Sequence, residues 1–183
     1  GGEKTLPCAP DGDPLLYAFK KQYEAQGGDS IWLRVFSGRA SSGDNLVAHP
    51  GRESERLGQM SVATGKHKDK VDAAVAGDIV QAAKLKVTAV GTTLHPSGKP
   101  FVLPPIPYPV PTFAEAISPV TAGDEDKMAS GINKIREEDP SFELKHQPEQ
   151  AQTLLVTQGE MHTAYILEKL KKQTGVEVER KRP

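Results

Sequence analysis

Seven prolines lie between Pro96 and Pro111, and they limit what the chain can fold into more than any other feature. Proline fixes φ and removes a backbone hydrogen-bond donor, so such a dense run forms neither a helix nor a central strand. It is typical of an extended, semi-stiff connector. The sequence therefore predicts two domains, residues 1–98 and 112–183, joined by a proline-rich linker over residues 99–111.

The segment before the linker has the pattern of an all-β barrel. I-W-L-R-V-F (31–36) alternates, with isoleucine, leucine and valine on one face and Trp32, Arg34 and Phe36 on the other. Turn-forming residues follow over 37–44. Further short strands are expected at 45–48, 55–60, 76–83 and 91–94. Short strands separated by glycine turns are typical of a closed barrel or a sandwich.

The segment after the linker changes to a mixed pattern. Thr121 and Asp124 have the spacing of a capping box at the start of a helix that Pro140 ends. A second helix is expected from 160 to 174, with Gly175 as its C-terminal cap. The expected strands are 113–120, 142–146, 153–157 and 176–180. The order strand, helix, strand, strand, helix, strand predicts an α+β ferredoxin-like βαββαβ domain.

Apolar stripes indicate which face of each helix is buried. Met128, Ile132 and Ile135 recur at helical spacing in the first helix, and Ile166, Leu167 and Leu170 do so in the second. We expect both stripes to face the sheet.

Composition excludes several classes of protein. The chain has 183 residues and a net charge of −1, so no overall field attracts nucleic acid. No stretch approaches the roughly 20 apolar residues of a membrane span, and no signal peptide is apparent. The single cysteine, Cys8, excludes an internal disulfide framework and a multi-cysteine metal site. We expect a cytoplasmic protein without membrane contact.

No catalytic constellation is apparent either. Gly65-Lys66 and Gly98-Lys99 lack the rest of a phosphate-binding P-loop, and N-K-I-R (133–136) lacks the aspartate that reads guanine. None of the five histidines has another at i+3 or i+4, the spacing that a helical metal site needs. We therefore predict no catalytic, cofactor-binding or metal-binding residue in this chain.

Two sets of ordered motifs carry a resemblance to a known family. R-V-F-S-G-R-A-S-S-G-D-N-L (34–46), E-R-L-G-Q-M (55–60) and V-D-A-A-V-A-G-D-I-V-Q-A-A (71–83) resemble the β-barrel that follows the GTPase domain in translational GTPases. After the linker, E-E-D-P-S-F-E-L, T-L-L-V-T-Q-G-E-M-H and L-K-K-Q-T-G-V-E-V resemble the third domain of elongation factor G. The likeness to the elongation factor G family covers nearly the whole chain.

The resemblance implies a middle fragment of an elongation factor G-like GTPase, consisting of its second and third domains. GTP, Mg²⁺ and hydrolysis would belong to a preceding domain, so this fragment is expected to be no enzyme and to be monomeric. Its implied partners are small-subunit ribosomal RNA and proteins, together with the GTPase and C-terminal domains of the parent. It would contact the ribosome and relay the nucleotide state between domains during translocation.

The motif Q-G-E-M-H resembles a corner that the family writes M-G-E-L-H. The resemblance implies an interdomain corner made by Gly159, Glu160 and His162, with the glycine at the turn and the acid in the first helical turn. The residues themselves leave open a plain helix start with a satisfied histidine. The family prefers leucine where Thr163 stands and an aromatic residue where Gln173 stands, which predicts looser packing of this helix.

Basic residues of the barrel are the candidates for contact with ribosomal RNA. These are Arg34, Arg39, Arg56, Lys66, His67, Lys68 and Lys70. Solvated surface is the alternative interpretation of the K-H-K-D-K run.

Two alternative functions stay open at this point. One is a fragment of a ribosomal protection protein or another ribosome-associated GTPase. The other is a stand-alone RNA- or ribosome-binding module, against which the aromatic content of 5% argues, because base stacking needs exposed aromatic rings.

Overall fold

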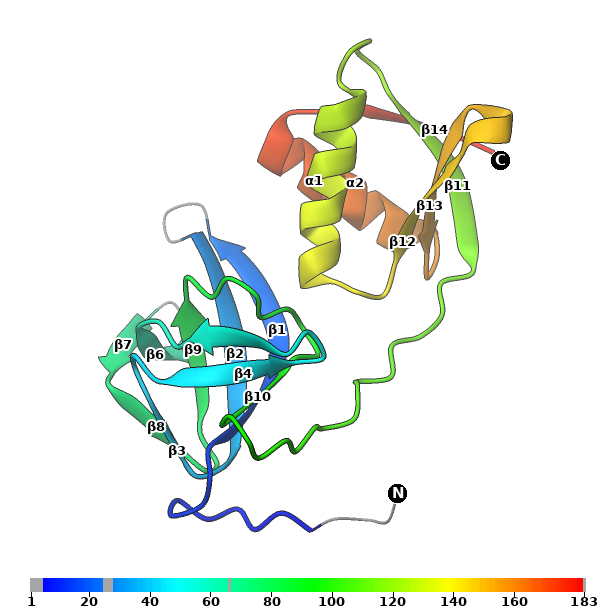
Figure 1. Ribbon diagram of the computed structural model, residues 1–183. Coiled ribbons are helices and arrows are strands. Elements are labelled where there is room, and N and C mark those ends of the chain that lie inside the picture. The colour runs from blue at the N-terminus through cyan, green and yellow to red at the C-terminus, as the bar shows by residue number, and fades with distance from the viewer. Residues whose placement is uncertain (1–4, 25–27, 66, 183) are drawn as a thin grey trace. The chain divides into compact units, whose positions relative to one another are not determined.

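The computed structural model, which describes residues 5–24, 28–65 and 67–182, divides the chain inside the proline-rich run (Figure 1). One unit extends up to Ile106 and the other begins at Pro107. The first is all-β and the second is α+β, which confirms the predicted fold class.

The first unit is built of antiparallel strands. They are β1 (Leu15–Glu24), β2 (Gly28–Ser37), β3 (Arg39–Ser41), β4 (Asn45–His49), β5 (Glu53–Arg56), β6 (Met60–Thr64), β7 (His67–Val71), β8 (Ala73–Val75), β9 (Ile79–Ala83) and β10 (Thr93–His95). Within the described residues they form an eight-stranded sheet in the order β5-β4-β10-β1-β2-β9-β6-β7 and a two-stranded sheet of β3 and β8. The large sheet curls around one apolar core (Figure 1).

Strand β2 confirms the predicted alternation. Ile31, Leu33 and Val35 are buried in the core, whereas Phe36 on the other face is exposed. The strand predicted over 76–83 begins only at Ile79, because Gly77 and Asp78 form a turn in which the Asp78 carboxylate accepts a hydrogen bond from the Val75 N–H at 2.8 Å. Strand β9 then enters the core with Val80 and Ala82.

Other features of the first unit differ from the sequence prediction. The sequence does not predict strand β1. Residues Leu15 to Ala18 are all buried and a bulge follows them, so apolar and polar residues do not alternate along this strand. The predicted strand 55–60 is wrong, because β5 ends at Arg56 and β6 begins at Met60. Strand β5 pairs with β4, whereas β6 pairs with β7 and β9. The predicted turn 37–44 contains β3, whose pairing with β8 is a long-range contact.

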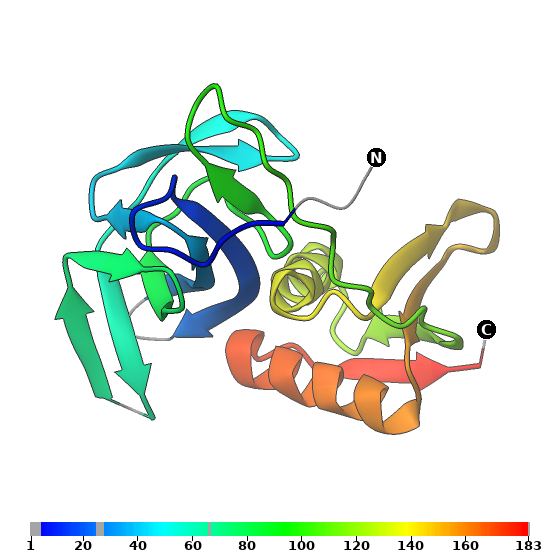
Figure 2. The same ribbon diagram turned by 90° about the horizontal axis from the view of Figure 1, so that it is seen from below.

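The second unit follows the predicted order of elements. It contains β11 (Phe113–Pro119), α1 (Glu125–Glu138), β12 (Glu143–Gln147), a short 3-10 turn (Pro148–Gln150), β13 (Gln152–Thr157), α2 (Glu160–Thr174) and β14 (Val178–Lys181). The sheet order is β12-β13-β11-β14. Both helices lie on one face of this sheet (Figures 1 and 2), where their apolar stripes form a common core with Phe142 and Leu155.

The helix ends show how local chemistry sets the boundaries. Gly175 caps α2 in the left-handed conformation (φ 74°), as predicted. The capping box at Thr121 and Asp124 is wrong: Asp124 itself is the N-cap of α1 and makes no side-chain cap bond. Instead the Glu125 carboxylate accepts a hydrogen bond from the Gly123 N–H at 3.0 Å, so an acid still satisfies a free donor there.

Each end of the proline-rich run is hydrogen-bonded to its own unit. In the first unit the Leu103 N–H donates to Thr93 Oγ1 at 3.2 Å, and the Tyr17 hydroxyl donates to the Pro104 carbonyl. In the second unit the Gln158 side chain donates to the Pro109 carbonyl at 3.0 Å. The boundaries predicted at residues 98 and 112 stay predictions.

Candidate functional site

Glu55 organises the first candidate site from inside the barrel. Its cross-strand partner on β4 is Leu46, so its side chain points to the core, and Glu55 is only 2% exposed. A buried carboxylate needs hydrogen-bond partners. It accepts from the backbone N–H groups of Lys86, Val87 and Thr88, at 2.8 to 3.1 Å, and from the Thr88 hydroxyl at 2.9 Å. This carboxylate therefore clamps the loop after β9 onto β5.

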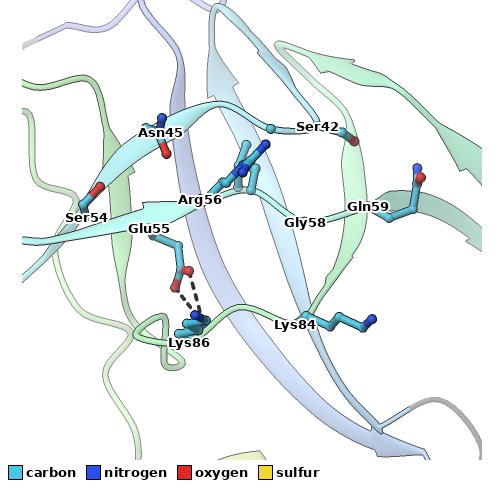
Figure 3. A pocket seen from close by; sticks show the side chains of 11 residues that line it. Ser42, Asn45, Ser54, Glu55, Arg56, Gly58, Gln59, Lys84 and Lys86 are labelled. Carbon is cyan, nitrogen blue, oxygen red and sulfur yellow. Dashed lines mark hydrogen bonds between the residues drawn. The ribbon is translucent and has the colours of Figure 1, made fainter.

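A polar pocket of about 610 Å³ lies along this clamp. Arg56 comes from β5, while Lys84 and Lys86 come from the clamped loop; Figure 3 shows Glu55 between the strand and that loop. The remaining lining residues are Ser42, Gly43, Asn45, Ser54, Leu57, Gly58 and Gln59. Of the predicted RNA contacts that the structure describes, only Arg56 lines this pocket.

The predicted basic run 66–70 lies partly on strand β7. Lys66 falls outside the described residues, and His67, Lys68 and Lys70 are exposed. Lys68 and Lys70 pair with Ala63 and Ser61 of β6 and share one face, so His67 lies on the other. The structure thus separates the histidine from the two lysines.

Arg34 and Arg39 do not join either group. Arg34 lies on β2, half-buried between Tyr17 of β1 and Ile79 of β9. Arg39 is exposed on β3, in the separate two-stranded sheet, opposite Val75. The predicted RNA contacts are thus spread over several surfaces of the barrel.

Lys84 and Lys86 are the functional candidates that sequence reasoning missed. They flank one apolar residue, Leu85, directly after β9, and this K-L-K pattern is the signal that was available. They line the same pocket as Arg56, and Glu55 holds the loop at Lys86.

The second candidate site is the corner between β13 and α2. His162 Nε2 lies 3.0 Å from Asp139 Oδ2, and the Gln158 backbone N–H donates to His162 Nδ1 at 3.3 Å. A ring that accepts at Nδ1 carries its hydrogen on Nε2, which donates to the carboxylate. Phe142 meets the imidazole edge to face, with ring centroids 5.9 Å apart. His162 is thus satisfied by residues of its own unit.

The Asp139 carboxylate is the centre of this corner. Burial by itself raises its pKa, but hydrogen bonds from the Ser141 hydroxyl and N–H and from His162 outweigh burial and lower the pKa below its ordinary value. The Ser141 hydroxyl donates to Asp139 rather than to His162. The three side chains therefore form a structural bracket and not a nucleophile-base pair.

Gly159 is the N-cap of α2 and Glu160 is its first residue. The backbone of Gly159 is extended (φ 160°, ψ 177°), and beyond its chain neighbours no described heavy atom lies within 4 Å of the position of an added Cβ. The corner therefore needs neither a left-handed backbone nor extra space there. Glu160 is exposed in the first turn of α2, where its charge complements the helix dipole.

The departures from the family pattern are compensated in the structure. Thr163 is fully buried, and its hydroxyl lies 2.9 Å from the Thr157 hydroxyl. Gln158 donates to the carbonyls of Pro109 and Ser141. Gln173 is exposed. At Thr163 a hydrogen bond stands where the family has an apolar side chain, and the looser packing of this helix stays a prediction.

The described ranges, 5–24, 28–65 and 67–182, hold neither a cluster of metal ligands nor a helix fit to span a membrane. There, no three side chains of His, Cys, Asp and Glu gather as metal ligands would. Neither α1 nor α2 has the length and apolar character of a bilayer-spanning helix.

Two family models match the chain in sequence order. The model for elongation factor G domain 2 matches residues 15–97, and the model for elongation factor G domain III matches residues 108–182. The matched ranges coincide with the two structural units apart from their termini and part of the proline-rich run.

Whole-chain comparisons agree with these models. An elongation factor G of Jannaschia sp. (strain CCS1) is 32% identical over 176 residues, which is 95% of this chain and 25% of that protein. A crystal structure of a Thermus thermophilus protein superposes with a TM-score of 0.81 at 33% identity, covering 94% of this chain and 26% of that one. The chain thus spans about a quarter of the length of these relatives.

Proposed function

Since this chain belongs to the elongation factor G family, as its second and third domains, we propose that it is the middle segment of a translation elongation factor that works on the ribosome. The observation that carries the proposal is the ordered match of both domain models across one proline-rich junction. The work of this segment is contact and positioning, because the corner and the barrel clamp hold chain segments together without an activated nucleophile.

The same membership supports a division of labour within a longer protein. GTP and Mg²⁺ would bind a preceding domain, and hydrolysis there would change how this segment contacts its neighbours. The corner at Gly159, Glu160 and His162 is proposed as the interdomain contact, and the ribosomal small subunit as the partner of the barrel. The cytoplasm follows as the compartment, and a monomer as the state of this segment.

One experiment tests the parent activity directly. The coding region on either side of this segment is sequenced, and the complete protein is assayed for GTP hydrolysis with and without ribosomes. We expect an upstream G-x-x-x-x-G-K-[ST] and N-K-x-D, and hydrolysis that ribosomes accelerate. A complete protein without these motifs, or one whose ribosome binding is undetectable, contradicts the proposal.

A further inference from the structure

A second pocket of the first unit lies beside strand β10. It has a volume of about 280 Å³ and a mostly apolar lining. Its walls come from two separate parts of the chain, Leu6 to Leu15 at the start of the unit and Pro96 to Phe101 after β10. Ligand sites usually have volumes of roughly 300–1,000 Å³, so this pocket suits a small, single-ring ligand.

The side chain of His95, which lines this pocket, is buried although it belongs to the outer face of its strand. Side chains alternate along a strand, and Leu94 points into the barrel core, so Thr93 and His95 point away from it. Both are nevertheless at most 5% exposed. The chain after β10 covers them, and the Leu103 N–H donates to Thr93 Oγ1 at 3.2 Å. The pocket therefore adjoins the outer face of β10, under the chain that folds back over it.

The hydrogen bonds of His95 leave one ring nitrogen as an acceptor. Nδ1 lies 2.8 Å from the Pro96 carbonyl oxygen, which can only accept, so Nδ1 carries a hydrogen. Nε2 of the neutral ring is then an acceptor, and no described residue donates a hydrogen bond to it. A buried polar atom without a partner is unfavourable, so Nε2 favours a ligand that donates a hydrogen bond.

An ion pair links the two walls of the pocket. Lys99 Nζ donates to both carboxylate oxygens of Asp13, at 2.8 and 3.0 Å, and the two residues lie 86 positions apart. Both side chains line the pocket and are exposed, whereas His95 is buried. The ion pair therefore lies at the solvent side of the pocket, and His95 lies at its buried end.

We propose that this pocket binds a small free phenol, whose hydroxyl donates a hydrogen bond to Nε2 of His95 and whose ring packs against Phe101 and the prolines of the walls. A phenol combines an apolar ring with one donor, which matches apolar walls around one acceptor. A hydrocarbon would leave Nε2 without a partner, and a charged ligand would have no counter-charge at the buried end. The inference goes beyond the proposed function and does not depend on it.

The first test compares p-cresol with toluene, which differ by one hydroxyl. Both are titrated into the whole chain, and the amide resonances of Leu15 and Phe101, which line the pocket, report binding. Gly77 lies outside the lining and gives the reference resonance. In a purely apolar cavity toluene would bind at least as well, because the hydroxyl would be desolvated without a partner.

We expect p-cresol to bind about tenfold more tightly than toluene, with saturable shifts of both reporter resonances. Equal or tighter binding of toluene overturns the proposal, and so does the absence of a saturable shift with p-cresol. This comparison needs only the wild type, so it stands whatever the folding of any variant.

Two variants separate the two ring nitrogens of His95. His95→Asn keeps a donor where Nδ1 faces the Pro96 carbonyl but removes the acceptor Nε2, so the preference for p-cresol should disappear. His95→Gln places an amide near the position of Nε2 and should keep part of the preference. The control is His67→Asn, at an exposed histidine of β7, and it should bind both ligands like the wild type. Thermal unfolding checks the folding of each variant, and an undiminished preference in folded His95→Asn overturns the proposal.

A tyrosine side chain of another protein carries the same phenol group, and N-acetyl-L-tyrosine amide represents it. Its peptide groups would have to displace the Asp13–Lys99 ion pair at the solvent side of the pocket. We expect it to bind about two- to fivefold more weakly than p-cresol, as opening an exposed ion pair implies. Binding as tight as that of p-cresol overturns the assignment to a free ligand.

Discussion

Glu55 in the barrel and Asp139 in the second unit each tie together distant segments, but they use different partners. Glu55 is 2% exposed and accepts mainly backbone N–H groups. The Asp139 side chain is 34% exposed and accepts from Ser141 and His162. In the barrel, one side chain accepts all the hydrogen bonds that hold the loop 86–88. In the second unit, the hydrogen bonds are shared among several residues, including Gln158. We therefore expect one substitution at Glu55 to lower the stability of the first unit strongly. Single substitutions in the network around Asp139 should each lower the stability of the second unit by a smaller amount.

The largest effect is expected for Glu55→Ala, which leaves several donors of the loop 86–88 without their acceptor. We expect unfolding of the first unit to become easier by about 3 kcal/mol. Urea unfolding followed by fluorescence of Trp32, the single tryptophan, reports on this unit alone.

Glu53→Ala is the matched control, since this exposed glutamate lies on the same strand. If Glu55→Ala lowered the stability no more than this control does, the idea that Glu55 alone holds the loop 86–88 would be contradicted.

Thr163→Val is expected to have a smaller effect, about 1 kcal/mol. It keeps the shape of the side chain but removes the hydroxyl that faces Thr157 Oγ1. The Thr157 hydroxyl also bonds to the Gly159 carbonyl, so it keeps a partner. Circular dichroism at helical wavelengths follows the second unit, because both described α-helices lie there.

Tyr165→Phe removes an exposed hydroxyl from the same helix and serves as the control. If Thr163→Val destabilised the second unit as strongly as Glu55→Ala destabilises the first, the corner would also depend on a single residue.

Acid should weaken the second unit through Asp139. Because the folded state lowers the pKa of this carboxyl below its ordinary 3.8, its stabilisation is fully present above about pH 4. It is lost as the pH falls through the lowered folded pKa. We expect the stability difference between the wild type and Asp139→Asn to shrink as the pH falls from about 5 to about 3.

Ser141→Ala separates the donors of this network. Removing the hydroxyl should move the pKa of Asp139 back toward its ordinary value, so the acid-induced loss of stability becomes smaller and is complete at a higher pH. A pH profile identical to the wild type would show that the Ser141 hydroxyl is not part of the bracket.

The smallest effect is expected for Gln158→Met, the residue that the family resemblance prefers. It removes hydrogen bonds to the carbonyls of Pro109 and Ser141, worth about 0.5 kcal/mol. Amide relaxation of Val110 should show faster motion in this variant. The control is Gln173→Met, at an exposed glutamine on α2. Equal motion of Val110 in both variants would show that the hydrogen bond from Gln158 to Pro109 does not restrain the proline-rich run.

The second unit is more predictable than the barrel for a physical reason. Helix α2 begins and ends where the sequence places it, because an acid, an apolar stripe and a C-terminal glycine agree locally. Strand β1 could not be recognised, since its bulges remove the alternation. Long-range pairing, such as β3 with β8, leaves no local signal at all.

The candidate sites show the same limit. The motif around His162 indicates the corner, but the partner Asp139 lies 23 residues away in sequence. The sequence identifies Arg56 by its charge and passes over Lys84 and Lys86, because a lysine's sequence context does not show which cavity it will line.

The sequence by itself determined the division into two units, their fold classes and the family, because proline density, periodicity and ordered motifs are properties of neighbouring residues. Only the tertiary structure decided that Glu55 draws the loop 86–88 onto β5 and that His162 turns toward Asp139. A buried carboxylate binds whichever donors the fold brings within about 3 Å, and that choice is made across the chain rather than along it.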